Sequence, residues 1–185
     1  MQVRSGRLLA LILLAVAPTA AQESAQRDSG TDGGKHLFIL SGQSNMQGLK
    51  PEESFIPTIV QQYGKGKSIV VFDAQGGQPI RRWYKQWTPG PKLAAPKGKQ
   101  VVLGDLYERL MSKVRSAIKD QKIASVTFLW MQGERDAREQ FADVYARSLQ
   151  GVLDQLARDL GRKDIRLVLG RLSDFDMLSA LDEAS

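Results

Sequence analysis

Four short, continuous apolar runs follow one another along the chain, and stretches with helical spacing lie between them. The runs are residues 37–40, 69–72, 126–130 and 167–169. Continuous apolar character over three to five residues is typical of strands that are covered on both faces. Strands that alternate with helices are joined by right-handed crossovers, so the pattern predicts a three-layer α/β fold built on a parallel sheet.

Two apolar stripes with helical spacing predict the long helices of this fold. The first runs from Leu106 to Ile118 and the second from Phe141 to Leu160. Gly161 follows the second stripe and is expected to end that helix. Residues 87–100 break the rhythm with three prolines, and we interpret them as a surface excursion.

The first 21 residues have the features of a secretory signal. Arg4 and Arg7 precede an apolar run at residues 8–17, and small residues follow it up to Ala21. Ten apolar residues are too few to cross a hydrocarbon core of ~30 Å, so we expect no stable membrane insertion. We therefore predict cleavage near Ala21, a secreted or periplasmic protein, a disordered leader at residues 22–34 and one domain at residues 35–185.

Composition narrows the chemistry that this domain can perform. The 185 residues include no cysteine and one histidine, so neither a Cys-rich zinc site nor a thiol nucleophile can be built, and we expect no metal site. The formal charge of +6 falls to +4 when Arg4 and Arg7 are removed with the signal. Because the other basic residues are scattered among acids, we expect no nucleic-acid partner. Hydrolytic chemistry would have to start from an oxygen nucleophile.

Loops rich in Gly, Gln and Ser follow the first three predicted strands, at residues 41–48, 73–80 and 131–136. Ligands of parallel sheets bind beyond the carboxyl ends of the strands, so these loops are the candidate site. Ser44 fits a nucleophile at a sharp turn, although Met46 breaks the G-x-S-x-G pattern. Taken alone, a serine in a polar loop after a strand is more often structural. Gly76 and Gly77 fit either a tight turn or a loop whose backbone N–H donates to an oxyanion. Gln132 fits either a residue that caps a strand end or a side-chain donor to the same oxyanion.

Three segments, taken together and in this order, carry a family resemblance: residues 40–46 (LSGQSNM), 75–80 (QGGQPI) and 130–137 (WMQGERDA). The chain resembles the sialate O-acetylesterase branch of the SGNH hydrolase superfamily, which includes acetyl-xylan esterases. That resemblance implies a flavodoxin-like, three-layer α/β fold with a parallel sheet. It also implies an acetylated carbohydrate as the substrate and no cofactor.

The resemblance assigns roles to individual residues. Ser44 is the nucleophile, the N–H groups of Ser44 and Gly77 are oxyanion donors, and the side chain of Gln132 completes the oxyanion hole. Glu134 and Asp136 orient the loops. The implied reaction is hydrolysis of an O-acetyl ester on a sugar through an acetyl-serine intermediate.

The chain departs from the family at the catalytic base. The family has an Asp-x-x-His motif after the last strand, and this sequence contains none, so no catalytic His or Asp is assigned. His36 begins the first strand, roughly 25 Å from Ser44 at about 3.3 Å per residue, and is expected to be an exposed residue rather than the base. We expect a C-terminally truncated member that lacks its last strand, with impaired activity and an exposed sheet edge.

Three alternative functions compete with the esterase. A non-catalytic glycan-binding relic of the same fold would stack sugars on Trp83, Trp87 and Trp130. A phosphate-binding loop at residues 64–68 is unfavourable because it precedes a strand and lacks the first glycine of that motif. Asp174 and Asp176 lack further ligands for a metal or glycosidase site, and we interpret them as solvated.

Overall fold

In the described part of the chain, four parallel strands form a sheet in the order β2-β1-β3-β4. The computed structural model describes residues 33–91 and 101–172, which belong to one compact unit. The strands are β1 (Lys35–Gly42), β2 (Ser68–Ala74), β3 (Ile123–Met131) and β4 (Ile165–Leu169). Each contains one of the apolar runs, so the predicted parallel α/β sheet is confirmed.

Two long helices and several short ones connect the strands. They are α2 (Ser44–Gln47), α3 (Phe55–Tyr63), the 3-10 helix η1 (Ile80–Arg82), α4 (Asp105–Ile118), α5 (Glu134–Arg138) and α6 (Ala142–Leu160). The helices α4 and α6 match the two apolar stripes. Helix α6 ends at Gly161, which has a φ of +63°, as expected for a glycine at a helix C-terminus.

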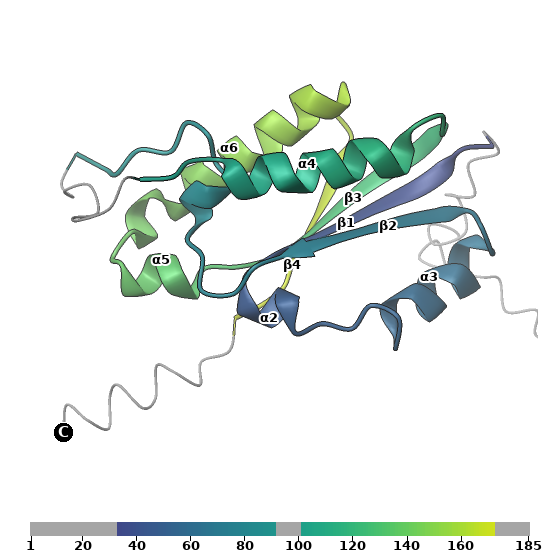
Figure 1. Ribbon diagram of the computed structural model, residues 1–185, viewed down its shortest axis with the longest axis horizontal. Helices are drawn as coiled ribbons and strands as arrows, with labels where there is room; N and C mark the ends of the chain where they lie inside the picture. The colour runs from purple at the N-terminus through teal and green to yellow at the C-terminus, as the bar shows by residue number, and fades with distance from the viewer. Residues whose placement is uncertain (1–32, 92–100, 173–185) are drawn as a thin grey trace, which may run out of the picture. The chain divides into compact units, whose positions relative to one another are not determined.

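Helices cover both faces of the sheet, which gives the fold three layers. Figure 1 shows α4 and α6 on one face and α2 and α3 on the other. The larger core lies under α4 and α6 and includes Ile39, Phe128 and Leu156. The smaller core lies under α2 and α3 and includes Leu40, Met46 and Ile59. Alternate residues of β1 point into different cores, so both of its faces are buried and its apolar run is continuous.

Strand β4 lies at the edge of the sheet and pairs only with β3 among the described strands. Its residues Val168 and Leu169 are 48% and 57% exposed, although both are apolar. The fold is therefore flavodoxin-like as predicted, with four strands and an edge that carries exposed apolar side chains in the described part of the chain.

Two expectations about single residues are wrong. Trp87 does not begin a surface excursion, because its side chain is buried and packs edge-on against Phe141 at a ring centroid distance of 5.1 Å. His36 is half-buried rather than exposed. Its Nδ1 lies 2.7 Å from Ser125 Oγ, and its ring packs against Tyr63. The signal segment at residues 1–21, most of the leader, residues 92–100, Asp174 and Asp176 lie outside the described residues.

Candidate active site

Ser44 lies just beyond the carboxyl end of β1, as the first residue of α2, and its side chain is exposed. The chain turns sharply there because Gly42 has a φ of +149° and the Gln43 N–H donates to the carbonyl of Met131 over 3.0 Å. This hydrogen bond ties the tip of β1 to the tip of β3. Among the described residues, the N–H of Ser44 itself has no acceptor. It is therefore available to a ligand.

The Gly76–Gly77 turn follows β2 and packs directly against Ser44. The N–H of Gln75 donates to the Gly42 carbonyl over 3.0 Å, which holds the tip of β2 against that of β1. A Cβ placed on Gly76 would lie only 3.6 Å from the Cβ of Ser44. Gly77 comes next and is exposed, and within the described ranges its N–H donates no hydrogen bond. Two unused backbone donors thus lie on adjoining loops.

Gln132 follows β3 and is buried beside the same loops. Its Nε2 donates to Asp136 Oδ2 over 2.5 Å and to the Gln78 carbonyl over 3.1 Å, and lies 3.4 Å from Gln43 Oε1. The structure therefore brings Gln132 close to the Ser44 loop, but its amide nitrogen already donates within the loop cluster. To donate to a substrate oxyanion, it has to redirect one of these N–H groups.

Glu134 and Asp136, on α5, connect all three loops through their carboxylates. Glu134 Oε1 accepts a hydrogen bond of 2.6 Å from Asn45 Nδ2, on the helix that begins with Ser44. Asp136 Oδ2 accepts one of 2.8 Å from the N–H of Ile80, which follows the Gly76–Gly77 turn. Burial raises the pKa of Asp136, although its hydrogen bonds from Gln132 and Ile80 oppose this shift.

Several contributors to this geometry are absent from the predicted site. Gln47 Oε1 accepts a hydrogen bond of 2.7 Å from the N–H of Gly76. Tyr145, on α6, donates to the Gln132 carbonyl and accepts a hydrogen bond of 3.0 Å from Trp130 Nε1. Burial raises the pKa of Tyr145. Of the residues that the predicted site lacks, Asn45 and Gln47 could have been suspected from the sequence, because both are polar and lie in the loop that contains Ser44.

The three tryptophans are core residues rather than a sugar-binding surface. Trp83, Trp87 and Trp130 are each at most 4% exposed and belong to the larger core. Trp83 and Trp130 pack edge-to-face with ring centroids 5.2 Å apart, and Trp83 Nε1 donates to Ser41 Oγ over 3.0 Å. Trp83 therefore contacts the carboxyl end of β1, and Trp130 belongs to the carboxyl end of β3.

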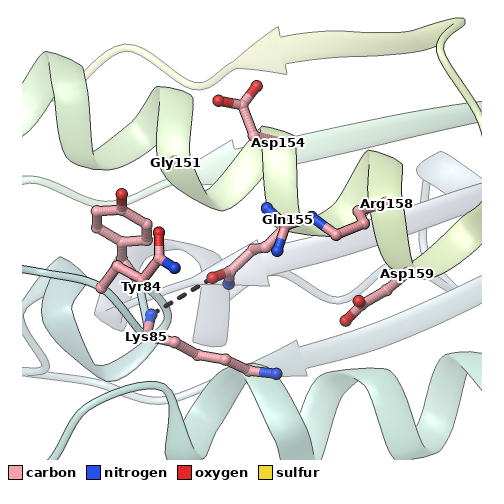
Figure 2. A pocket seen from close by; sticks show the side chains of 8 residues that line it. Tyr84, Lys85, Gly151, Asp154, Gln155, Arg158 and Asp159 are labelled. Carbon is pink, nitrogen blue, oxygen red and sulfur yellow. Dashed lines mark hydrogen bonds between the residues drawn. The ribbon is translucent and has the colours of Figure 1, made fainter.

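A separate small cavity of about 100 Å³ lies where the segment after η1 crosses α6 (Figure 2). Tyr84, Lys85, Asp154 and Arg158 are among its lining residues, and none of the predicted site residues lines it. Within the described ranges, no group of three His, Asp or Glu residues is placed to hold a metal ion, and no helix is long and apolar enough to span a membrane.

Comparison with known proteins decides the family. The sequence model of the family described as carbohydrate esterase, sialic acid-specific acetylesterase, matches residues 47–184. The chain belongs to this family. The matched range contains Gly77, Gln132, Glu134 and Asp136 and begins just after Ser44. Membership makes the chain a carboxylic ester hydrolase by family, with acetylated carbohydrate as the family's substrate class.

Among solved structures, the chain is similar to a protein from Arabidopsis thaliana determined by X-ray crystallography. The two share 17% sequence identity with a TM-score of 0.56, and the match covers 74% of this chain and 73% of the other. At this identity the likeness shows a common fold. No curated protein matches the chain.

Proposed function

We propose that this esterase is an SGNH-type serine hydrolase that removes O-acetyl groups from carbohydrates of the sialic acid or xylan type. One observation carries the proposal: the unused N–H groups of Ser44 and Gly77 lie on adjoining loops beside an exposed Ser44 hydroxyl. Backbone donors beside a nucleophile can form the oxyanion hole that stabilises the tetrahedral intermediate of acyl transfer. Membership in the carbohydrate esterase family supports the substrate class.

The reaction follows from these positions. Ser44 Oγ attacks the acetyl carbonyl, and the resulting oxyanion accepts hydrogen bonds from the N–H groups of Ser44 and Gly77. Collapse of the tetrahedral intermediate breaks the ester bond and leaves the acetyl group on Ser44. The proton that Ser44 Oγ loses is carried by water to the departing sugar oxygen, which leaves as a hydroxyl. Water then hydrolyses this ester and releases acetate. Preorganised donors of this kind each contribute about 10²–10³ to turnover.

The remaining site residues support this centre. Gln132 adds a side-chain donor to the oxyanion when one of its N–H groups turns from Asp136 or Gln78 toward the substrate. Glu134 and Asp136 keep the three loops in register through Asn45 and Ile80. They act on the geometry of the site and do not contact the reacting atoms.

We further propose that these 185 residues turn over slowly, because they contain no histidine base near Ser44. His36, the one histidine in the sequence, is the second residue of β1, whereas Ser44 lies beyond the other end of that strand. A base has to lie within about 3 Å of the proton that it accepts. Without one, Ser44 remains a weak nucleophile at neutral pH.

Chemical rescue tests both parts of the proposal. Acetate release from acetylated xylo-oligosaccharides and from O-acetylated sialic acid is measured with and without added imidazole, for the wild type and for Ser44→Ala. We expect little Ser44-dependent release without imidazole and a rise with imidazole concentration in the wild type alone. A Ser44-dependent kcat of about 1–10³ s⁻¹ without imidazole would contradict the impairment. No Ser44-dependent release in any condition would contradict the esterase.

The alternative function, a non-catalytic glycan-binding relic, loses its main support. Its three candidate stacking residues are buried in the core, so they present no ring face to a sugar. Glycan binding without any Ser44-dependent hydrolysis would nevertheless favour it in the same experiment.

We also propose export of the protein, with cleavage near Ala21 and the esterase domain at residues 35–185. The support is the basic start followed by an apolar run of ten residues. N-terminal sequencing of the protein recovered from a secreting host tests this, with residue 22 as the expected first residue. Retention of residues 1–21 would contradict it.

A further inference from the structure

The turn that carries Gly77 is held in place from two sides. On one side, Gln75 Oε1 accepts a hydrogen bond of 2.6 Å from Arg109 on α4. On the other, the N–H of Gly76 donates to Gln47 Oε1 over 2.7 Å. These contacts are made by Gln75 and Gly76, the two residues that precede Gly77 in the chain. The position of its N–H therefore depends on how these two neighbours are held.

Gln47 lies on the same short helix as Ser44, three residues further along. Its N–H donates to the Gln43 carbonyl over 2.8 Å, which keeps it in register with Ser44. Between them, Met46 is 2% exposed and anchors α2 in the smaller core. A side chain on this helix thus links the nucleophile directly to the turn after β2.

We propose that Gln47 is a positioning residue that holds the Gly76–Gly77 turn so that the Gly77 N–H faces the acetyl group on Ser44; this inference rests on the proposed function. Peptide groups are planar, so the N–H of Gly77 is separated from that of Gly76 by only the two soft dihedrals of Gly76. Glycine changes these dihedrals at little cost. Holding the N–H of Gly76 fixes the peptide plane before these two dihedrals, so the direction of the Gly77 N–H is set relative to a fixed point on α2.

The close packing of Gly76 against Ser44 makes the orientation of this turn matter. A Cβ on Gly76 would lie 2.9 Å from Gln47 Oε1 and 3.6 Å from Ser44 Cβ, so the turn has little space to shift toward either residue. Arg109 is a poorer test of the same idea, because it also pairs with the buried carboxylate of Asp73. Gln47 is exposed and can be changed without removing a partner from a buried charge.

Three variants test this role: Gln47→Ala removes the acceptor, Gln47→Glu keeps an acceptor oxygen, and Gln61→Ala changes an exposed glutamine on α3 as the matched control. Hydrogen exchange at the Gly76 amide is measured by NMR on the full chain. Ser44-dependent acetate release in imidazole gives kcat and KM separately. Urea denaturation reports stability.

We expect Gln47→Ala to speed exchange at Gly76 and to lower kcat by roughly 10-fold, less than the 10²–10³ for a lost donor. KM should stay within about twofold, and Gln47→Glu should restore most of kcat. Unchanged exchange at Gly76 in Gln47→Ala would overturn the proposal, and so would faster exchange with unchanged kcat. If the wild type shows no Ser44-dependent release, the proposed function fails, and exchange at Gly76 still decides whether Gln47 holds the turn.

Discussion

Gly42 and Met131 meet where the tips of β1 and β3 touch, and a Cβ on Gly42 would overlap the carbonyl group of Met131. The φ of Gly42, +149°, is one that residues with a side chain rarely adopt. These two constraints direct the chain away from the sheet just before Ser44. Glycine at position 42 is therefore a condition for the site.

Gly42→Ala should destabilise the protein by about 3 kcal/mol, because a backbone clash and an unfavourable φ coincide. Urea denaturation at pH 7 measures this. Gly66→Ala is a suitable control, since a Cβ there would meet nothing within 4 Å although φ is also positive. Equal losses in the two variants would show that the contact with Met131 contributes little.

The hydrogen bond from Asn45 to Glu134 should behave as a directional link between α2 and α5. Asn45→Ala should cost about 1 kcal/mol. Asn45→Asp should cost more, because two carboxylates would face each other at the 2.6 Å contact. Adding Glu134→Gln to Asn45→Asp supplies a donor from the other side and should recover stability. A double-mutant cycle of unfolding free energies with no coupling would show that the link is unimportant.

Gly151 on α6 should tolerate no side chain while Tyr84 is present. The Tyr84 ring lies where a Cβ on Gly151 would be (Figure 2). Replacing a helical glycine by alanine usually stabilises by roughly 0.5–1 kcal/mol. Here we expect Gly151→Ala to destabilise the wild type and to stabilise the Tyr84→Ala variant, measured by urea denaturation. The same sign in both backgrounds would contradict the steric explanation.

Asp136 should make stability fall as pH rises above about 4. Its folded-state pKa is raised by burial above the ordinary 3.8, so the folded protein binds this proton more tightly than the unfolded chain. The stability from this group is complete below pH 3.8 and is lost as pH rises through the folded-state pKa.

Two measurements check the behaviour of Asp136. Carbon-13 NMR of its carboxyl group should give a midpoint above 3.8. Asp136→Asn should remove this part of the pH dependence of the unfolding free energy. The comparison is made with the wild type because Asp105 contributes to the pH dependence with the opposite sign. Its pKa is lowered by the hydrogen bond that it accepts from Arg82. A midpoint at or below 3.8 would contradict the effect of burial.

Much of the architecture follows from the sequence alone. The apolar runs and the two stripes predict the four described strands, α4, α6 and the parallel arrangement. Both faces of β1 are buried, as its continuous apolar run indicates, whereas Val168 and Leu169 of the edge strand β4 are exposed. The position of Ser44, Gly77 and Gln132 just after strand ends then brings them to one edge of the sheet. The short elements α2, α5 and η1 escape prediction, since three to five residues are too few to show a period.

Only the tertiary structure decides which polar groups are engaged and which stay available. Gln47 pairs with Gly76 across 29 positions and Asn45 with Glu134 across 89, and such pairs depend on the strand order β2-β1-β3-β4. The same order buries the tryptophans and brings the Gln132 amide to the Gln78 carbonyl, 54 positions away in the chain. Hydrophobic periodicity acts locally along the chain, whereas a hydrogen bond between distant residues requires the register of the whole sheet.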